Sequence, residues 1–249
     1  MSKILGLIPA RFASTRLFGK PLRFIGNKPM IQHTYESALK SIYLDKLVVL
    51  TDDVRIFNAV KSFGGEVEIT PQDLQSGTDR CAYYSEKFPE YDIVVNIQGD
   101  EPFIHREVID KTIKPLLQIE EIQVATAGTY FKDPNLVPNP SLPKVVLDEN
   151  GFAVYFSRSV IPYYQSEEFE KRYIRHIGIY VYRREALLKI TKLPQTRLER
   201  IEKLEQLRMI ENGFKIKVEL VDYEPISVDT EEDLIYANNY WKEKYGIKE

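Results

Sequence analysis

The residues Ile4–Leu22, ILGLIPARFASTRLFGKPL, decide the fold, because a short apolar run passes directly into a basic loop. The run Ile4–Ala10 is typical of a buried strand and is too short for a signal-peptide core or a membrane span. The loop after it offers Arg11, Arg16 and Lys20, two hydroxyls and many backbone amides. A triphosphate needs this mixture of cations and neutral donors. A solvated basic loop is the alternative interpretation, and the glycine pattern of a Walker loop is absent.

Charge is one-sided in this region and balanced over the whole chain. Residues 1–35 contain six lysines and arginines, and the first acid of the sequence is Glu36. The 249 residues carry a formal net charge of -3, with 43% hydrophobic and 29% charged residues. This composition predicts a globular protein that does not bind nucleic acid, so a phosphate-bearing ligand would be held by local cations. The single cysteine, Cys81, excludes an internal disulfide and suits a reducing, cytoplasmic compartment.

The first half of the sequence alternates short apolar strands with amphipathic helices. This alternation predicts an α/β fold with a mostly parallel sheet and helices on both faces. Ligands are expected at the carboxyl ends of its strands. The predicted strands are Lys3–Ala10, Lys46–Thr51, Glu66–Thr70, Asp92–Ile97 and Gln123–Thr129, and the predicted helices are Pro29–Ser41, Val54–Phe63, Gly77–Phe88 and Arg106–Gln118.

The second half has a different pattern and predicts a smaller lobe. Four prolines between residues 134 and 143 indicate an irregular connection. We predict one domain over residues 1–249, with a main lobe of about 1–130 and 215–249 and a smaller substrate or dimerisation lobe of about 131–214. The predicted elements are a hairpin of Lys144–Asp148 and Phe152–Ser157, an exposed loop Tyr163–Arg172, a strand Ile174–Tyr182, helices at Arg184–Thr191 and Leu198–Asn212, a strand Lys215–Val221 and a helix from Glu231.

Two aspartates follow predicted strands and are candidate metal ligands. In the segment Asp92–Pro102, DIVVNIQGDEP, an apolar strand is followed by the polar turn Gln98–Glu101, which contains Asp100. A carboxylate at a strand's carboxyl end is well placed to hold Mg²⁺ against phosphates, and an acidic turn is the alternative. Asp229 lies between a predicted strand and the last helix. It could be a second metal ligand, or it could complement the helix dipole.

A third segment, Gln75–Arg80 with the sequence QSGTDR, places hydroxyls, amides and a cation at a predicted helix start, where anions bind well. Taken alone, it is better explained as an N-cap, since Ser76 and Asp79 resemble a capping box. The three histidines include His176, at the polar beginning of an apolar strand. A lone histidine in such a strand is more often structural than catalytic.

Together these segments resemble the CMP-KDO synthetases (3-deoxy-manno-octulosonate cytidylyltransferases) over nearly the whole chain. The family's motifs occur in its order, and their combination is highly specific: IPAR-FASTRL-FGKPL, QSGTDR, NIQGDEP, KVVLDENGFAVYFSRSVIP, RHIGIY, LEQLRMIENG and VDTEEDL. The resemblance implies a nucleotide-binding α/β fold and a homodimer. It also implies Mg²⁺-dependent transfer of CMP from CTP to the anomeric hydroxyl of KDO, an acidic eight-carbon sugar, with release of pyrophosphate, as a step of lipopolysaccharide biosynthesis.

The resemblance also implies roles for individual residues. Catalytic roles fall to Arg11, Lys20, Asp100 and Asp229, and the two aspartates resemble the family's Mg²⁺ ligands. The implied nucleotide contacts are Pro9, Ala10, Arg11, Ser14, Arg16, Lys20, Gln75, Ser76, Gly77, Arg80 and Asp100. The implied sugar contacts are Gln98, Arg158, His176, Tyr180, Glu205 and Gln206. The planar guanidinium of Arg158 is suited to a sugar carboxylate.

Two departures from the family pattern bear on specificity. The family usually has proline where this chain has Phe18, and glycine where it has Val181. Another acidic sugar, such as 8-amino-KDO or a sialic acid, is therefore an alternative acceptor. A glycosyltransferase is a further alternative, although the sequence Gln98–Glu101 lacks that class's usual Asp-x-Asp metal motif. A nucleotide-binding module without activity is the third alternative, and the presence of both aspartates and all the loop cations counts against it.

Overall fold

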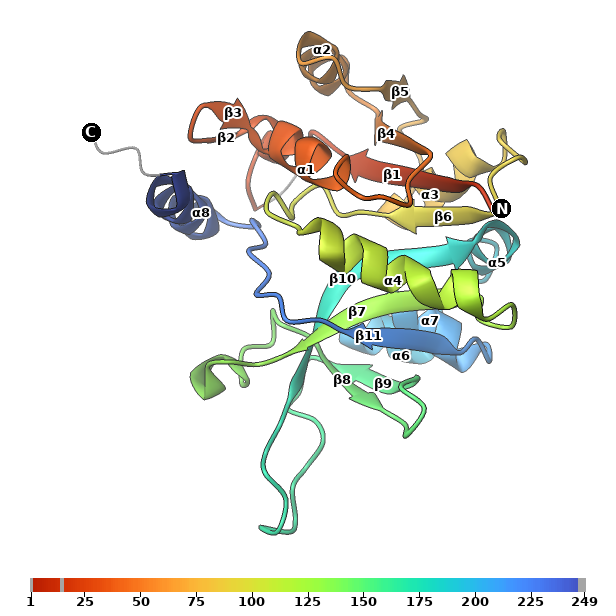
Figure 1. Ribbon diagram of the computed structural model, residues 1–249, viewed down its shortest axis with the longest axis vertical. Helices are drawn as coiled ribbons and strands as arrows, with labels where there is room; N and C mark the ends of the chain where they lie inside the picture. The colour runs from red at the N-terminus through yellow and green to blue at the C-terminus, as the bar shows by residue number, and fades with distance from the viewer. Residues whose placement is uncertain (1, 14–15, 246–249) are drawn as a thin grey trace. The chain divides into compact units, whose positions relative to one another are not determined.

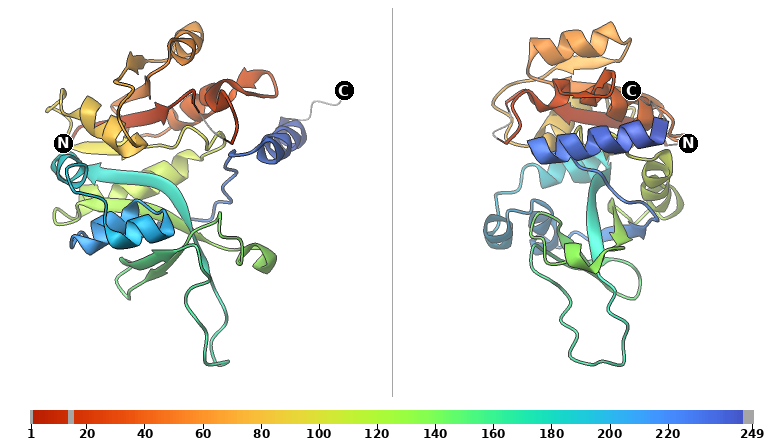
Figure 2. Two further views of the ribbon diagram at one scale, coloured as in Figure 1. Left: turned by 180° about the vertical axis from the view of Figure 1, so that it is seen from behind. Right: turned by 90° about the vertical axis from the view of Figure 1, so that its left-hand side faces the viewer.

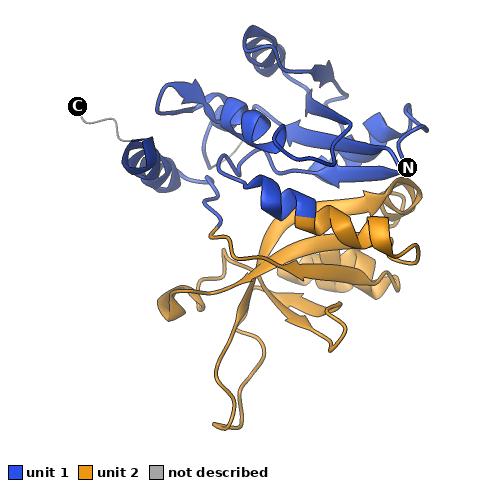
Figure 3. Ribbon diagram, in the orientation of Figure 1, with its two compact units in different colours: residues 1–110, 225–249 blue, residues 111–224 orange. Residues whose placement is uncertain are grey.

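The computed structural model describes residues 2–13 and 16–245, and the chain divides into two compact units (Figure 3). Unit 1 comprises residues 1–110 and 225–249, and unit 2 comprises residues 111–224. These boundaries differ from the predicted lobes at two strands, β7 (Val124–Tyr130) and β11 (Ile216–Leu220), which belong to unit 2. The reason is strand pairing, because β7 is hydrogen-bonded to β11 and to another strand of unit 2.

Unit 1 contains four parallel strands, in the order β6-β1-β4-β5 (Figure 1). They are β1 (Ile4–Ala10), β4 (Lys46–Thr51), β5 (Val67–Ile69) and β6 (Ile93–Asn96), each inside or equal to its predicted range. The helices are α1 (Met30–Ala38), α2 (Val54–Ser62), α3 (Gly77–Ser85) and α8 (Glu231–Tyr245), while α4 (Arg106–Gln118) crosses the unit boundary. A 3₁₀ turn, η1 (Lys20–Leu22), and a small hairpin of β2 (Phe24–Ile25) and β3 (Lys28–Pro29) precede α1.

The direction in which strands are added to the sheet reverses beside β1. From β1 the chain passes through α1 to β4 on one side, and it later returns through α3 to β6 on the other side. Right-handed crossovers that run in opposite directions place their helices on opposite faces of the sheet. Figures 1 and 2 show α1 and α3 on the two sides of β1 in this way. The carboxyl ends of β1 and β6 therefore meet where an open α/β sheet binds its ligands.

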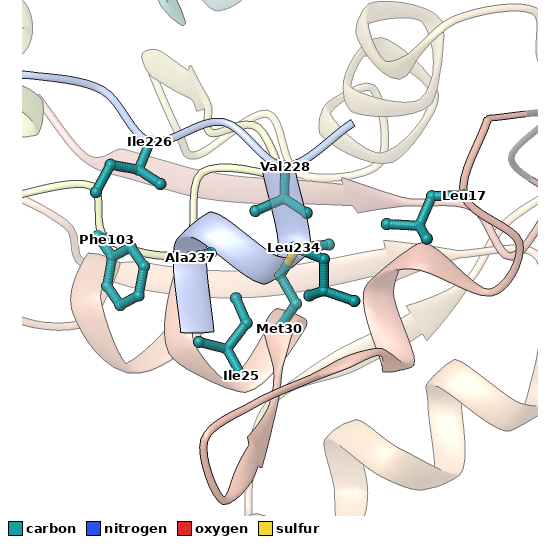
Figure 4. Packing of buried hydrophobic residues seen from close by; sticks show 8 residues of the cluster. All are labelled: Leu17, Ile25, Met30, Phe103, Ile226, Val228, Leu234 and Ala237. Atoms are coloured by element: carbon teal, nitrogen blue, oxygen red, sulfur yellow. The ribbon is translucent and has the colours of Figure 1, made fainter. Parts of the chain in front are cut away.

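A buried apolar cluster connects the basic loop after β1 to the C-terminal segment (Figure 4). It contains Leu17 from the loop, Val228 and Leu234 from the C-terminal segment, and Met30 from α1. The remaining members are Ile25, Phe103, Ile226 and Ala237, with Tyr240 and Trp241 packed against them. Burying these side chains holds Leu17 and Val228 within one cluster, so the polar residues next to them in the sequence are held as well.

Unit 2 is built around β10 (Ile174–Arg183), which is antiparallel to β7 and pairs at its beginning with β8 (Lys144–Leu147). β8 forms the predicted hairpin with β9 (Ala153–Ser157), and β11 pairs in parallel with β7. The helices are α5 (Arg184–Ile190), α6 (Arg197–Glu202) and α7 (Gln206–Glu211), and a 3₁₀ turn, η2 (Pro134–Leu136), lies in the proline-rich connection.

Hydrogen bonds confirm the predicted capping box at α3, where Ser76 and Asp79 bond reciprocally. Thr230 and Asp233 exchange the same pair of bonds at the start of α8. Gly213 has a φ of 78°, as expected for a residue that ends a helix. Pro29 caps α1 instead of occupying its first turn, because its ψ of 148° is extended.

No helix in the described part of the chain is both long enough and apolar enough to cross a membrane.

One predicted helix is wrong. The range Leu198–Asn212 contains two helices, α6 and α7, because Lys203 adopts a left-handed conformation with a φ of 53°. The carbonyl groups of Glu202 and Lys203, which a continuous helix would bond internally, instead accept from the guanidinium of Arg158 at 2.7 and 3.2 Å. A tertiary contact therefore ends α6 where the sequence has neither glycine nor proline.

Candidate functional site

Three residues from distant parts of the sequence meet at the carboxyl edge of the unit 1 sheet. The ammonium of Lys20 lies 2.6 Å from Oδ2 of Asp100 and 2.8 Å from Oδ1 of Asp229. Burial alone would lower the pKa of Lys20, but the two carboxylates outweigh it and raise that pKa above its ordinary value. Arg16 also reaches Oδ1 of Asp229, at 3.0 Å. The predicted proximity of the two aspartates to each other and to the basic loop is thus present in the structure.

The backbone holds this group in place from several sides. The amide of Val228 donates to the carbonyl of Asp100 at 3.0 Å, so the segments that carry the two aspartates are hydrogen-bonded side by side. The amide of Asp229 donates to Asp233 at the start of α8. Gly19, immediately before Lys20, has a φ of 65°, which favours glycine. The arrangement is therefore set by main-chain bonds and by the cluster in Figure 4, and not by the charges alone.

A second pair of cations in unit 1, Arg80 and Arg11, has buried guanidinium nitrogens. The guanidinium of Arg80 is fully buried, donating to Asp52 at 2.8 Å and to the hydroxyl of Thr70. Burial lowers the pKa of Arg80; the Asp52 carboxylate opposes that shift, and the charge of Arg11 adds to it. Nε and Nη2 of Arg11 and Nε of Arg80 are buried without a hydrogen-bond partner. Buried donors of this kind are costly, so the guanidinium groups of Arg11 and Arg80 are suited to an additional anion.

The three predicted nucleotide-binding segments converge on Pro9. A β-carbon added to Gly77 would lie 3.0 Å from the ring of Pro9, and one added to Gly99 would lie 3.1 Å from its carbonyl oxygen. The absence of side chains at both glycines lets the start of α3 and the acidic turn approach the end of β1. Thr34 adds a hydrogen bond to the carbonyl of Gly99 at 3.2 Å. The structure therefore brings together segments from three parts of the sequence.

The other predicted unit 1 residues have less specific surroundings. Ala10 is buried at the end of β1, Ser76 caps α3, and Ser14 lies outside the described residues. Gln75 donates to the carbonyl of Asp73, and Gln98 donates to Asn96 at 3.3 Å. No described contact assigns either glutamine to a ligand, so their roles stay predictions.

The aspartate pair fits a magnesium ion by its chemistry. Mg²⁺ is commonly held by one or two carboxylates together with phosphate oxygens and water. Asp100 and Asp229 already share one cation, the ammonium of Lys20, at short distance. Over residues 2–13 and 16–245, no group of three or more His, Cys, Asp or Glu side chains could hold a metal ion. The protein would therefore supply two ligands, and the remainder would come from the nucleotide and water.

Four of the predicted sugar residues lie in one region of unit 2. His176 and Tyr180, both buried on β10, have ring centroids 5.5 Å apart. Burial, aided by the charge of Arg175, lowers the pKa of His176 to about 3, so its imidazole is neutral. Burial, with the nearby charge of Glu205, raises the pKa of the Tyr180 hydroxyl well above its ordinary value. Gln206 follows Glu205 and is buried at the start of α7.

Arg158 already has three acceptors. Its guanidinium donates to the carbonyls of Pro140 at 2.9 Å, Glu202 at 2.7 Å and Lys203 at 3.2 Å. These three acceptors are uncharged carbonyl groups, so they fix the position of the guanidinium without neutralising its positive charge. A sugar carboxylate remains a suitable partner, and this role stays a prediction.

Val181, which stands where the family usually has glycine, is fully buried in β10, next to Tyr180 in the sequence.

Sequence reasoning missed two contributors to the nucleotide region. Asp52 is the partner of Arg80 and directly follows β4, so the expectation of ligands at strand ends could have identified it. The second is an aromatic stack on the basic loop. The rings of Phe12 and Phe18 meet edge to face at 4.9 Å, and the guanidinium carbon of Arg55 lies 3.3 Å from the centroid of Phe12. No spacing in the sequence signals this contact.

Comparison with known proteins assigns the family. A family model described as cytidylyltransferase matches residues 5–217. The chain belongs to the cytidylyltransferase family. Two curated 3-deoxy-manno-octulosonate cytidylyltransferases are close relatives: that of Parabacteroides distasonis is 49% identical, over 94% of this chain and 96% of its own, and that of Fusobacterium nucleatum is 46% identical, over 97% and 98%. At this identity and coverage, the chain is a member of the 3-deoxy-manno-octulosonate group of the family.

Solved structures agree with the fold of this cytidylyltransferase. A CMP:2-keto-3-deoxy-manno-octonic acid synthetase complexed with CTP superposes with a TM-score of 0.92 at 39% identity, over 98% of this chain and all of that one. A 4-diphosphocytidyl-2C-methyl-D-erythritol synthase from Anaerococcus prevotii has a TM-score of 0.62 at 15% identity, which supports the fold alone. The predicted nucleotide-binding α/β fold is confirmed.

Proposed function

We propose that this chain transfers the CMP group of CTP to the anomeric hydroxyl of 3-deoxy-D-manno-octulosonate, releasing pyrophosphate. The observation that carries the proposal is the group of cations and aspartates at the carboxyl ends of β1 and β6. Buried donors of Arg11 lack acceptors, and Lys20 lies against both Asp100 and Asp229. The relatives named for this activity and the CTP complex of a similar synthetase support the substrates.

The reaction is an in-line displacement at the α-phosphorus of CTP. The sugar hydroxyl oxygen forms the new bond to phosphorus, the bond to the β-phosphate oxygen breaks, and the hydroxyl proton passes to solvent. Arg11, Arg16 and Lys20 would offset the charge that develops on the leaving pyrophosphate. The guanidinium of Arg11 needs little reorganisation for this task, since its donors are already desolvated. No described side chain is assigned as a separate base.

We propose Mg²⁺ as the cofactor, held by Asp100 and Asp229. When bound, the ion supplies charge neutralisation at the phosphates and acidifies the attacking hydroxyl. The two carboxylates would fix the position of the ion. Their own backbones are held by the hydrogen bond from the amide of Val228 to the carbonyl of Asp100 and by the bond from the amide of Asp229 to Asp233. The sugar contacts of Gln98, Arg158, His176, Tyr180, Glu205 and Gln206 belong to the same proposal.

A pyrophosphate-release assay tests the function and its specificity. Four nucleoside triphosphates are each combined with KDO, 8-amino-KDO and a sialic acid in the presence of Mg²⁺. We expect release with CTP and KDO to exceed every other combination. Turnover with another sugar only would replace the acceptor, and turnover with none would refute the proposed transfer.

The Asp100→Ala variant tests the proposed metal site in the same assay. We expect pyrophosphate release to fall by at least about 10²-fold, since the variant loses one of the two carboxylates that would hold Mg²⁺ against the phosphates. The matched control is Asp222→Ala, because Asp222 is 88% exposed and pairs only with Lys132 among its described ion pairs. Near-normal turnover of Asp100→Ala would remove Asp100 from the metal site.

We also propose a cytoplasmic homodimer, on the family resemblance. Light scattering after size exclusion checks the assembly: a mass near that of one 29.0 kDa chain across micromolar concentrations would exclude the dimer.

A further inference from the structure

The most unusual feature of the site is the position of Lys20. Its ammonium contacts Oδ2 of Asp100 and Oδ1 of Asp229, the carboxylates that the proposed Mg²⁺ would need. We infer that Lys20 is an exchangeable internal cation: it neutralises the aspartate pair in the free protein and moves to the polyphosphate when metal and nucleotide enter together. This inference rests on the proposed function, and it assigns Lys20 a second role as a competitor of the metal.

Electrostatics makes the two arrangements exclusive. An ammonium at 2.6–2.8 Å from both carboxylates lies where a divalent ion would have to bind, and two cations sharing those oxygens would repel each other strongly. Arg16 adds a further cation at 3.0 Å from the same Asp229 oxygen. The free protein therefore offers a divalent ion a pair of carboxylates whose charge is already compensated.

The nucleotide can shift this balance because it supplies new acceptors. Lys20 has a flexible stem and three donors, so its ammonium can exchange a carboxylate for a phosphate without movement of its backbone. Its backbone is fixed by Gly19 before it and by η1, which begins at Lys20. Exchange then couples the two ligands: the metal binds weakly alone and more tightly with CTP, and by reciprocity the metal improves CTP binding.

Mn²⁺ titration without nucleotide, followed by electron paramagnetic resonance, tests the exchange independently of activity. We expect Lys20→Met to bind Mn²⁺ at least about tenfold more tightly than the parent protein, since a competing unit charge is removed. Lys20→Gln, which keeps hydrogen-bond donors for the carboxylates, is the second variant and should show the same gain. Lys20→Arg, which keeps the charge, should bind Mn²⁺ as weakly as the parent.

Two controls separate competition from net charge and locate the bound ion. Arg23→Gln removes the same charge from a nearby pair, Arg23–Glu231, that does not involve the two aspartates, so its Mn²⁺ affinity should equal the parent's. Adding Asp100→Asn and Asp229→Asn to Lys20→Met should abolish the gain. Equal affinity in Lys20→Met, Lys20→Gln and the parent would overturn the exchange, whereas the proposed function fails if the parent releases no pyrophosphate from CTP in the presence of KDO.

Discussion

At the scale of single residues, Arg11 shows that a ligand-binding side chain can lower the stability of the ligand-free protein. Two of its guanidinium nitrogens are buried without partners, and its charge faces that of Arg80. Such a group opposes folding until an anion binds it. We therefore expect Arg11→Met to raise the thermal unfolding midpoint of the ligand-free protein and to lower kcat/KM for CTP by about 10²–10³-fold.

Calorimetry and the pyrophosphate assay on the same preparation check both halves of this prediction. Arg172→Met is the matched control, because Arg172 is 60% exposed in unit 2 and pairs with Glu170. It should change neither the midpoint nor the kinetics appreciably. A lower midpoint in Arg11→Met would mean that its guanidinium stabilises the free protein, contrary to the argument from its unpaired donors.

At the scale of helices and strands, local patterns predicted most of unit 1. β4 and α4 have the bounds that the sequence predicted, because their apolar periodicity and their flanking residues agree. Strand ends also located the polar segments, since ligands of an open α/β sheet gather there. The interruption between α6 and α7 could not be predicted in this way, because it depends on Arg158, 45 residues before Lys203.

Side-chain contacts between elements were the least predictable part of the site. The sequence indicated that Lys20, Asp100 and Asp229 act on one ligand, but nothing in their spacing shows the ammonium lying between the carboxylates. The stack of Phe12, Phe18 and Arg55 likewise joins the basic loop to α2 through tertiary packing. It offers a local reason why a chain without the family's usual proline at position 18 can still hold its loop.

At the scale of the whole molecule, the predicted nucleotide contacts and the exposed loop 163–172 belong to different units. Every predicted nucleotide and metal residue belongs to residues 1–110 or 225–249, whereas the loop 163–172 belongs to unit 2. Tyr163 in that loop is 83% exposed, and the loop's ends are joined by bonds between the Tyr164 hydroxyl and the backbone of Arg172. Exposed backbone of this kind is the preferred target of proteases.

We therefore expect brief trypsin treatment to cut first after Lys171 or Arg172, as N-terminal sequencing of the fragments would show. The cut places Asp100 and Asp229 on different fragments, but β10 pairs with β7 across the cut, so the fragments should elute together. Because the cut is in unit 2 and the cations of the nucleotide region are in unit 1, CTP with Mg²⁺ should still raise the unfolding midpoint of the nicked protein. A nicked protein that stays associated but no longer responds to CTP would show that the loop contributes to nucleotide binding, and the assignment of that binding to unit 1 alone would be wrong.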